Sequence, residues 1–130
     1  MSAGPRLVTP RFVLVVACGI SYFLALGVVM PNVPRYVKHE LGGSSLAVGV
    51  ATGTLFIGAV ILRPIAGRIG DRLGRKVLVV GGAATVAVSL FLYALAHSLL
   101  VLIAARLLTG LGEAAFFVGA ATMVTDLAPV

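Results

Sequence analysis

The chain has 130 residues, of which 60% are hydrophobic and only 11% are charged, whereas about a quarter of the residues of a soluble domain carry charge. This composition predicts an integral membrane protein, and at roughly 20 residues per crossing the chain has room for four transmembrane helices and no soluble domain. The net charge of +6 fits the Lys and Arg that membrane proteins keep in cytoplasmic loops, so nucleic acid is not expected as a partner.

The first apolar run predicts a helix over about 12–33, ending where Pro31 and Pro34 interrupt helical hydrogen bonding. The run is longer than the apolar core of a signal peptide, so we expect a retained helix. Ser21 and Asn32 fall on one face of it, in a stripe of small and polar groups. That stripe is either a helix-packing face or a cavity wall.

The second predicted helix covers about 45–66 and carries small residues at Gly49, Gly53 and Gly58, which favour close helix packing. A polar, glycine-punctuated segment over 67–76 follows, with four of the ten Lys and Arg residues, and it is predicted to be a loop. The third helix, over about 77–96, has few polar groups and is expected to face lipid or to be purely structural. Its connector to the next helix is so short that the two must form an antiparallel hairpin.

The fourth predicted helix, over about 99–124, is unusual because it contains Arg106 and Glu113. A charge at the centre of a bilayer costs roughly 2.5–3.5 kcal/mol on insertion scales. The two residues are seven apart and therefore share a helix face, with Thr109 and Gly110 between them. Two interpretations stay open: a polar clamp between helices that never titrates, or proton coupling in which Glu113 exchanges a proton and Arg106 tunes it.

Charge asymmetry predicts the orientation. Six basic residues lie near the N-terminus and in 67–76, against two after the first helix. The first group is Arg6, Arg11, Arg68, Arg72, Arg75 and Lys76, and the second is Arg35 and Lys38. The positive-inside rule therefore predicts a multi-pass protein of the cell membrane with its N-terminus and the 67–76 segment in the cytoplasm.

No sequence feature indicates an enzyme, a cofactor or a metal. The segment 67–76 lacks the glycine spacing and the Lys-Ser/Thr ending of a phosphate-binding loop, and no Cys/His cluster has the spacing of a metal site. The lone Cys18 lies inside the first apolar run and is expected to be a small packing residue.

Three motifs support a family resemblance. The segment 67–76 has the form G-x-x-x-D-R-x-G-R-K, Arg106 is followed by two glycines, and an acidic residue and a proline follow the fourth helix. The residues that carry these motifs are Gly67, Asp71, Arg72, Gly74, Arg75 and Lys76, then Arg106, Gly110 and Gly112, then Asp126 and Pro129. With these motifs the chain resembles the N-terminal third of a major facilitator superfamily transporter, and in particular the drug/proton antiporters.

The resemblance implies a fold of twelve helices in two halves, of which this chain would supply part of the first six-helix half, with substrate bound at the midplane. It implies transport of small molecules by alternating access, proton-coupled efflux, and a cavity lined by helices one and four. Ser21, Asn32, Arg106, Gly110 and Glu113 would then serve the cavity or proton coupling.

In this family the 67–76 segment is a conformational switch. The resemblance implies that Asp71 contacts the opposing half and that Arg75 pairs with Asp126. The expected partners are the lipid bilayer, a small-molecule substrate, protons, and either the missing C-terminal helices or a full-length relative.

Three interpretations of the length remain. A truncated transporter chain would not transport alone, because four helices cannot enclose a cavity between two halves. A complete four-helix multidrug antiporter acting as a dimer fits the length better, but such exporters carry their essential glutamate in helix one, which here has no acid. A regulatory membrane fragment that binds a full-length relative is the third.

Overall fold

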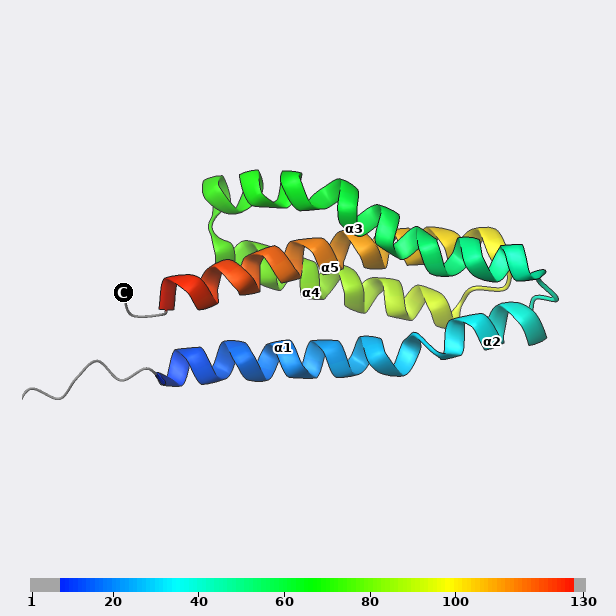
Figure 1. Cartoon of the computed structure of the whole chain (residues 1–130), viewed down its shortest axis with the longest axis horizontal. Helices are drawn as coiled ribbons and strands as arrows, with labels where there is room; N and C mark the ends of the chain where they lie inside the picture. Colours follow the sequence, from blue (N-terminus) through cyan, green and yellow to red (C-terminus); the bar gives the residue numbers. More distant parts are fainter. Residues whose placement is uncertain (1–7, 128–130) are drawn as a thin grey trace, which may run out of the picture.

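The computed structural model describes residues 8–127, which form five helices (Figure 1). They are α1 (Pro10–Val29), α2 (Asn32–His39), α3 (Ser45–Leu73), α4 (Arg75–Ala94) and α5 (Leu99–Leu127). The spans Pro10–His39, Ser45–Leu73, Arg75–Ala94 and Leu99–Leu127 are long and apolar enough to cross a membrane. The prediction of an all-α membrane protein with four spanning helices is therefore confirmed.

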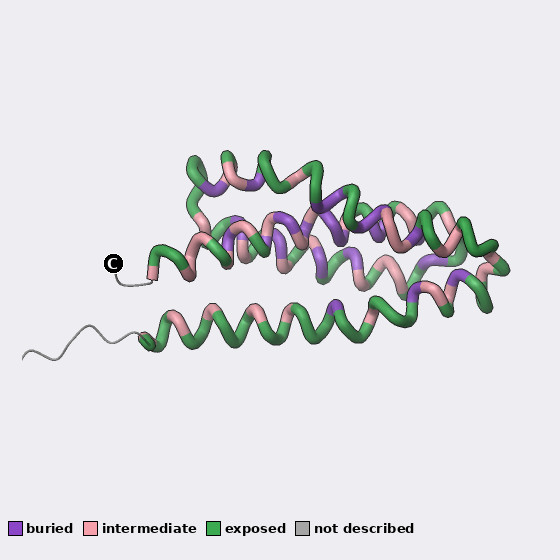
Figure 2. Tube along the Cα trace, viewed as in Figure 1, coloured by how far each residue is buried: buried purple, intermediate pink, exposed green. Residues whose placement is uncertain are grey.

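The core of the structure is built around α5, which packs extensively against both α3 and α4. Figure 2 shows burial concentrated on α5 and on the sides of α3 and α4 that face it. By contrast, α1 is almost entirely exposed, and Leu26 is its one buried residue. The exposed faces of these helices are mostly apolar, as expected of surfaces that meet lipid.

Glycines allow the helix backbones of the core to touch. A Cβ atom on Gly58 of α3 would stand 2.8 Å from the Leu107 carbonyl oxygen of α5, and one on Gly82 of α4 would stand 2.7 Å from a carbonyl oxygen of α5. Both distances are too short for a carbon atom, so a larger residue would push the helices apart. Gly49 and Gly53 have nothing within 4 Å of such an atom, so of the three glycines predicted to pack closely on α3, Gly58 is the one that does.

The first predicted helix, over 12–33, extends too far at its C-terminal end. In the structure α1 ends at Val29, and a second, short helix, α2, begins at Asn32. Residues 35–39, which lie between the first two predicted helices, therefore belong to a helix. Pro31 precedes α2, and Pro34 falls in its first turn, where a missing N–H costs nothing because that group has no helical partner. Val33 and Val37 of α2 then complete a small apolar core with α3 and α5.

The loop predicted over 67–76 is wrong, because α3 continues to Leu73 and α4 begins at Arg75. Hydropathy marks where a chain leaves the hydrocarbon, whereas Arg, Leu and Lys continue a helix readily. The 29 residues of α3 extend about 44 Å, well beyond the roughly 30 Å hydrocarbon layer. The helix bends along its length (Figure 1), and Pro64 in its interior removes one backbone hydrogen bond.

The boundaries of the other two spans also shift by a few residues. The third spanning helix occupies Arg75–Ala94 instead of 77–96, and the fourth continues from 124 to Leu127. That last extension matters because it includes Asp126 in the helix.

Candidate functional site

Gly74 is the single non-helical residue between α3 and α4. Its φ of 93° and ψ of 153° lie in a region that only glycine adopts without strain, and its N–H bonds to the Gly70 carbonyl oxygen at 3.0 Å. The chain therefore reverses direction in one residue. Asp71 and Arg72 are left exposed on the last turn of α3, and Gly67 lies one turn earlier beside open space.

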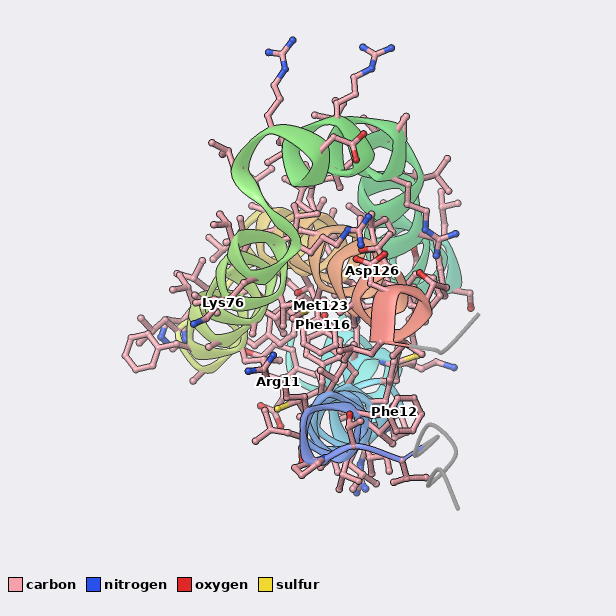
Figure 3. The ribbon with its side chains drawn as sticks, turned by 90° about the vertical axis from the view of Figure 1, so that its left-hand side faces the viewer. Arg11, Phe12, Lys76, Phe116, Met123 and Asp126 are labelled. Atoms are coloured by element: carbon pink, nitrogen blue, oxygen red, sulfur yellow. The ribbon has the colours of Figure 1, made fainter. Side chains whose placement is uncertain are left out.

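Arg75, the first residue of α4, forms an ion pair with Asp126 near the end of α5. The same guanidinium nitrogen donates a hydrogen bond to the Thr122 carbonyl oxygen at 3.4 Å. The two side chains of the ion pair are 38% and 53% exposed, so the pair adds only about 0–1 kcal/mol to stability. Its consequence is positional, since it ties the start of α4 to the end of α5. Figure 3 shows Lys76 pointing away from Asp126 on the outer side of α4.

An open cavity of about 760 Å³ lies at this end of the bundle. Arg11 of α1, Asp71 of α3, Arg75 of α4 and Asp126 of α5 all line it, together with Met123. Figure 3 shows Arg11 extending from α1 toward the other helices. Asp71 forms no ion pair with any other residue in the range 8–127. Four charged groups from four helices thus meet at one cavity, and the carboxylate of Asp71 is free within that range.

Arg106 is buried at the crossing of α5 and α3, with 1% of its surface exposed. Its Nε donates to the Ala51 carbonyl oxygen at 2.9 Å and its Nη2 to the Thr52 carbonyl oxygen at 3.3 Å. Gly110 lies one turn further along α5, where a Cβ atom would overlap the carbonyl oxygen of Leu55. Arg106 and Gly110 therefore act together as a fastening between α5 and α3.

Glu113 is on the same helix but makes different contacts. Arg106 and Glu113 form no ion pair with each other, and the Oε2 atom of Glu113 is buried without a hydrogen-bond partner. The carboxyl group of Glu113 is close enough to Arg63 on α3 and to Arg106 to be affected by their positive charges. The polar-clamp interpretation thus describes Arg106, whereas Glu113 is left with a free acceptor inside the bundle.

The residues predicted for the α1 stripe do not join this group. Ser21 donates its hydroxyl to the Ala17 carbonyl oxygen at 2.9 Å and lines an open cavity of about 800 Å³ between α1 and α4. Asn32 begins α2, donates to the Val28 carbonyl oxygen at 2.7 Å, and lines a separate cavity of about 280 Å³. Both side chains are exposed, and each donates to a backbone carbonyl oxygen of α1 four residues earlier.

Sequence reasoning missed two sets of side chains. Ser89 and Tyr93 of α4 each hydrogen-bond the Thr109 hydroxyl of α5, at 2.9 and 2.6 Å; their four-residue spacing on one helix face was the available signal. Tyr22 of α1 stacks on Phe116 of α5, with ring centroids 3.9 Å apart and planes 9° from parallel. Tyr22 was overlooked because aromatic residues are common in apolar helices.

Over residues 8–127, no three His, Cys, Asp or Glu side chains lie close enough together to hold a metal ion. The thiol of Cys18 is free and exposed on α1, so the expectation that it packs between helices is wrong. Its helix makes too few contacts with the bundle to cover it.

Residues 15–130 match the family model described as Major Facilitator Superfamily. The chain belongs to this superfamily, which confirms the resemblance drawn from its motifs.

Two curated relatives are similar to most of the chain. Quinolone resistance protein NorA of Staphylococcus aureus is 29% identical over 107 residues, which cover 82% of this chain and 27% of NorA. Multidrug resistance protein 1 of Bacillus subtilis is 34% identical over 108 residues, which cover 83% of this chain and 28% of that protein. The chain thus spans about a quarter of the length of the curated relatives it matches.

Proposed function

We propose that these helices belong to the substrate-moving part of a small-molecule exporter that works by alternating access and is driven by protons. The family membership supports export of small molecules. So do the names of the two relatives, which refer to resistance to quinolones and to multiple drugs. A quinolone is therefore the first substrate to test.

The observation that carries proton coupling is the unpaired Oε2 atom of Glu113. A carboxylate fixed in an ion pair is held in its charged form, whereas a buried carboxyl group with a free oxygen can change its protonation state. Arg106 does not fix it, because two of the hydrogen bonds of that guanidinium go to the backbone of α3. Glu113 is thus a group inside the bundle that can take up a proton in one state and release it in another.

Glu113→Gln tests this role, and Glu40→Gln is its matched control. The same change of chemistry is made in both, but Glu40 is exposed between α2 and α3. The complete gene product that carries these 130 residues is placed in everted vesicles, and uptake of a fluorescent quinolone is followed after a pH gradient is imposed. We expect Glu40→Gln to keep gradient-driven uptake and Glu113→Gln to lose it. Full gradient-driven uptake by Glu113→Gln would remove the proposal, and no uptake by the parent protein would remove the quinolone.

We also propose that the end of the bundle around Gly74 faces the cytoplasm and is the conformational switch. Five basic residues of the described chain lie toward this end and support the orientation: Arg11, Arg68, Arg72, Arg75 and Lys76. The Arg75–Asp126 ion pair and the free carboxylate of Asp71 beside the 760 Å³ cavity support the switch. In one transport state Asp71 would engage a surface outside this bundle, while the ion pair keeps α4 and α5 together.

A further inference from the structure

Two buried polar atoms without hydrogen-bond partners belong to helices that face each other. They are the Tyr22 hydroxyl oxygen of α1 and the Oε2 atom of Glu113 on α5. Leaving a buried polar group unpaired costs roughly 1–3 kcal/mol, so two such groups in one region call for an explanation. The Tyr22 hydroxyl is close enough to Glu113 to be affected by the charge of its carboxylate. The hydroxyl of Tyr22 is thus a donor, and the Oε2 atom of Glu113 an acceptor, that each lack a partner.

Aromatic packing fixes where the Tyr22 ring lies. It stacks on Phe116, which is three residues from Glu113 and hence on a neighbouring part of the same helix surface. Phe23 meets the ring edge-on, with centroids 5.5 Å apart. Phe116 itself is only 3% exposed and lies between α5 and α1 (Figure 3). The phenol is thus held beside the face of α5 that carries Glu113.

The charged groups around Glu113 leave this role open to Tyr22. From α3 comes Arg63, which is within 5.5 Å of the Phe117 ring centroid, and from α5 itself comes Arg106, which is bonded to the α3 backbone. The segment 77–92 of α4 contains no ionisable side chain. Neither arginine forms an ion pair with Glu113. Two buried hydroxyl oxygens of the described residues lack a hydrogen-bond partner, those of Tyr22 and of Thr52 on α3, and Tyr22 is the one whose ring stacks on α5 close to Glu113 in sequence.

We infer that Tyr22 is the positioning residue of Glu113: its hydroxyl donates a hydrogen bond to the carbonyl oxygen of the protonated Glu113 carboxyl group and thereby closes α1 onto α5. The inference rests on the proposed exchange of a proton at Glu113. The loose packing of α1, whose one buried residue is Leu26, means that few other contacts resist the small movement that forms the bond. Protonation of Glu113 would in this way make α1 pack more tightly against the bundle.

Infrared difference spectroscopy of the full chain in lipid, between acidic and neutral pH, tests the bond directly. The carboxyl C=O band of Glu113 is the one that Glu113→Gln removes. Tyr22→Phe keeps the ring that stacks on Phe116 and deletes only the donor, so we expect the band to move to higher wavenumber because the carbonyl is freed. Tyr36→Phe is the matched control, since its hydroxyl bonds to the Ala96 carbonyl oxygen at the other end of the bundle, and it should leave the band in place.

The outcomes separate this inference from the proposed function. A Glu113 band that Tyr22→Phe leaves unmoved overturns the bond but not proton exchange at Glu113. If Glu113→Gln removes no band at any pH at which the protein stays folded, the carboxyl group does not exchange a proton, and both are overturned. As a second arm, Glu113→Asp draws the carboxyl group back by one methylene, so its band should not respond to Tyr22→Phe. A response there would contradict the direct hydrogen bond.

Discussion

Replacing Gly110 by Ala should open the crossing between α3 and α5. The added Cβ atom would overlap the Leu55 carbonyl oxygen and stand 3.0 Å from the Ala59 nitrogen, and both are backbone atoms that cannot rotate away. Overpacking of this kind costs about 1–3 kcal/mol, from which the better helix propensity of Ala returns about 0.5–1 kcal/mol. Arg106 lies one turn away, and losing one of its charged hydrogen bonds to α3 adds about 1.5–3 kcal/mol.

Together these effects predict a loss of about 2–5 kcal/mol, which shifts the unfolding equilibrium by at least roughly 30-fold. The assay is equilibrium unfolding of the full chain in mixed micelles of a mild detergent and dodecyl sulfate, followed by circular dichroism. Gly53→Ala on α3 is the matched control, since nothing lies within 4 Å of its added carbon, and it should be neutral or slightly stabilising. The packing argument is refuted if Gly110→Ala is as stable as Gly53→Ala.

Two further predictions concern the Gly74 end. Asp126→Asn removes the partner of Arg75 and should change stability by less than about 1 kcal/mol, yet broaden the distance between spin labels on α4 and α5; unchanged transport together with an unchanged distance distribution would count against the switch. For the orientation, cysteines at Lys76 or Lys38 in a Cys18→Ala background are treated with a membrane-impermeant thiol reagent in right-side-out vesicles. Only the cysteine at Lys38 should react, and the reverse pattern would place the Gly74 end outside.

The number and the type of the spanning helices were predictable, whereas their ends were not. A run of about 20 apolar residues has few stable alternatives to a helix in a bilayer, because every backbone polar group must be bonded internally. The end of α3 at Leu73 depends instead on where helical backbone hydrogen bonding stops. The polar residues of 67–73 do not interrupt that hydrogen bonding. Gly74 was the informative position, since within 67–76 it alone adopts a backbone conformation that a side chain would strain.

The candidate site was predictable where a residue type is costly in a membrane. Arg106 and Glu113 stand out for that reason, and the structure places both inside the bundle. Their separate contacts were not readable from a spacing of seven residues, because spacing fixes the helix face but not the neighbour that meets it. Tyr22 illustrates the same limit. Its proposed role depends on Phe116 and Glu113, which are more than 90 residues away along the chain.

The different contacts of Arg106 and Glu113 on α5 follow from what a bilayer permits. A buried guanidinium cannot be deprotonated, so it has to be satisfied permanently, and the backbone oxygens of α3 supply that without any opposing charge. A buried carboxyl group can be neutralised by a proton, so it needs no permanent partner. If Arg106 were instead bonded to Glu113, the carboxylate would be held in its charged form and could not serve as the proposed proton site. Its commitment to α3 is therefore what leaves Glu113 available.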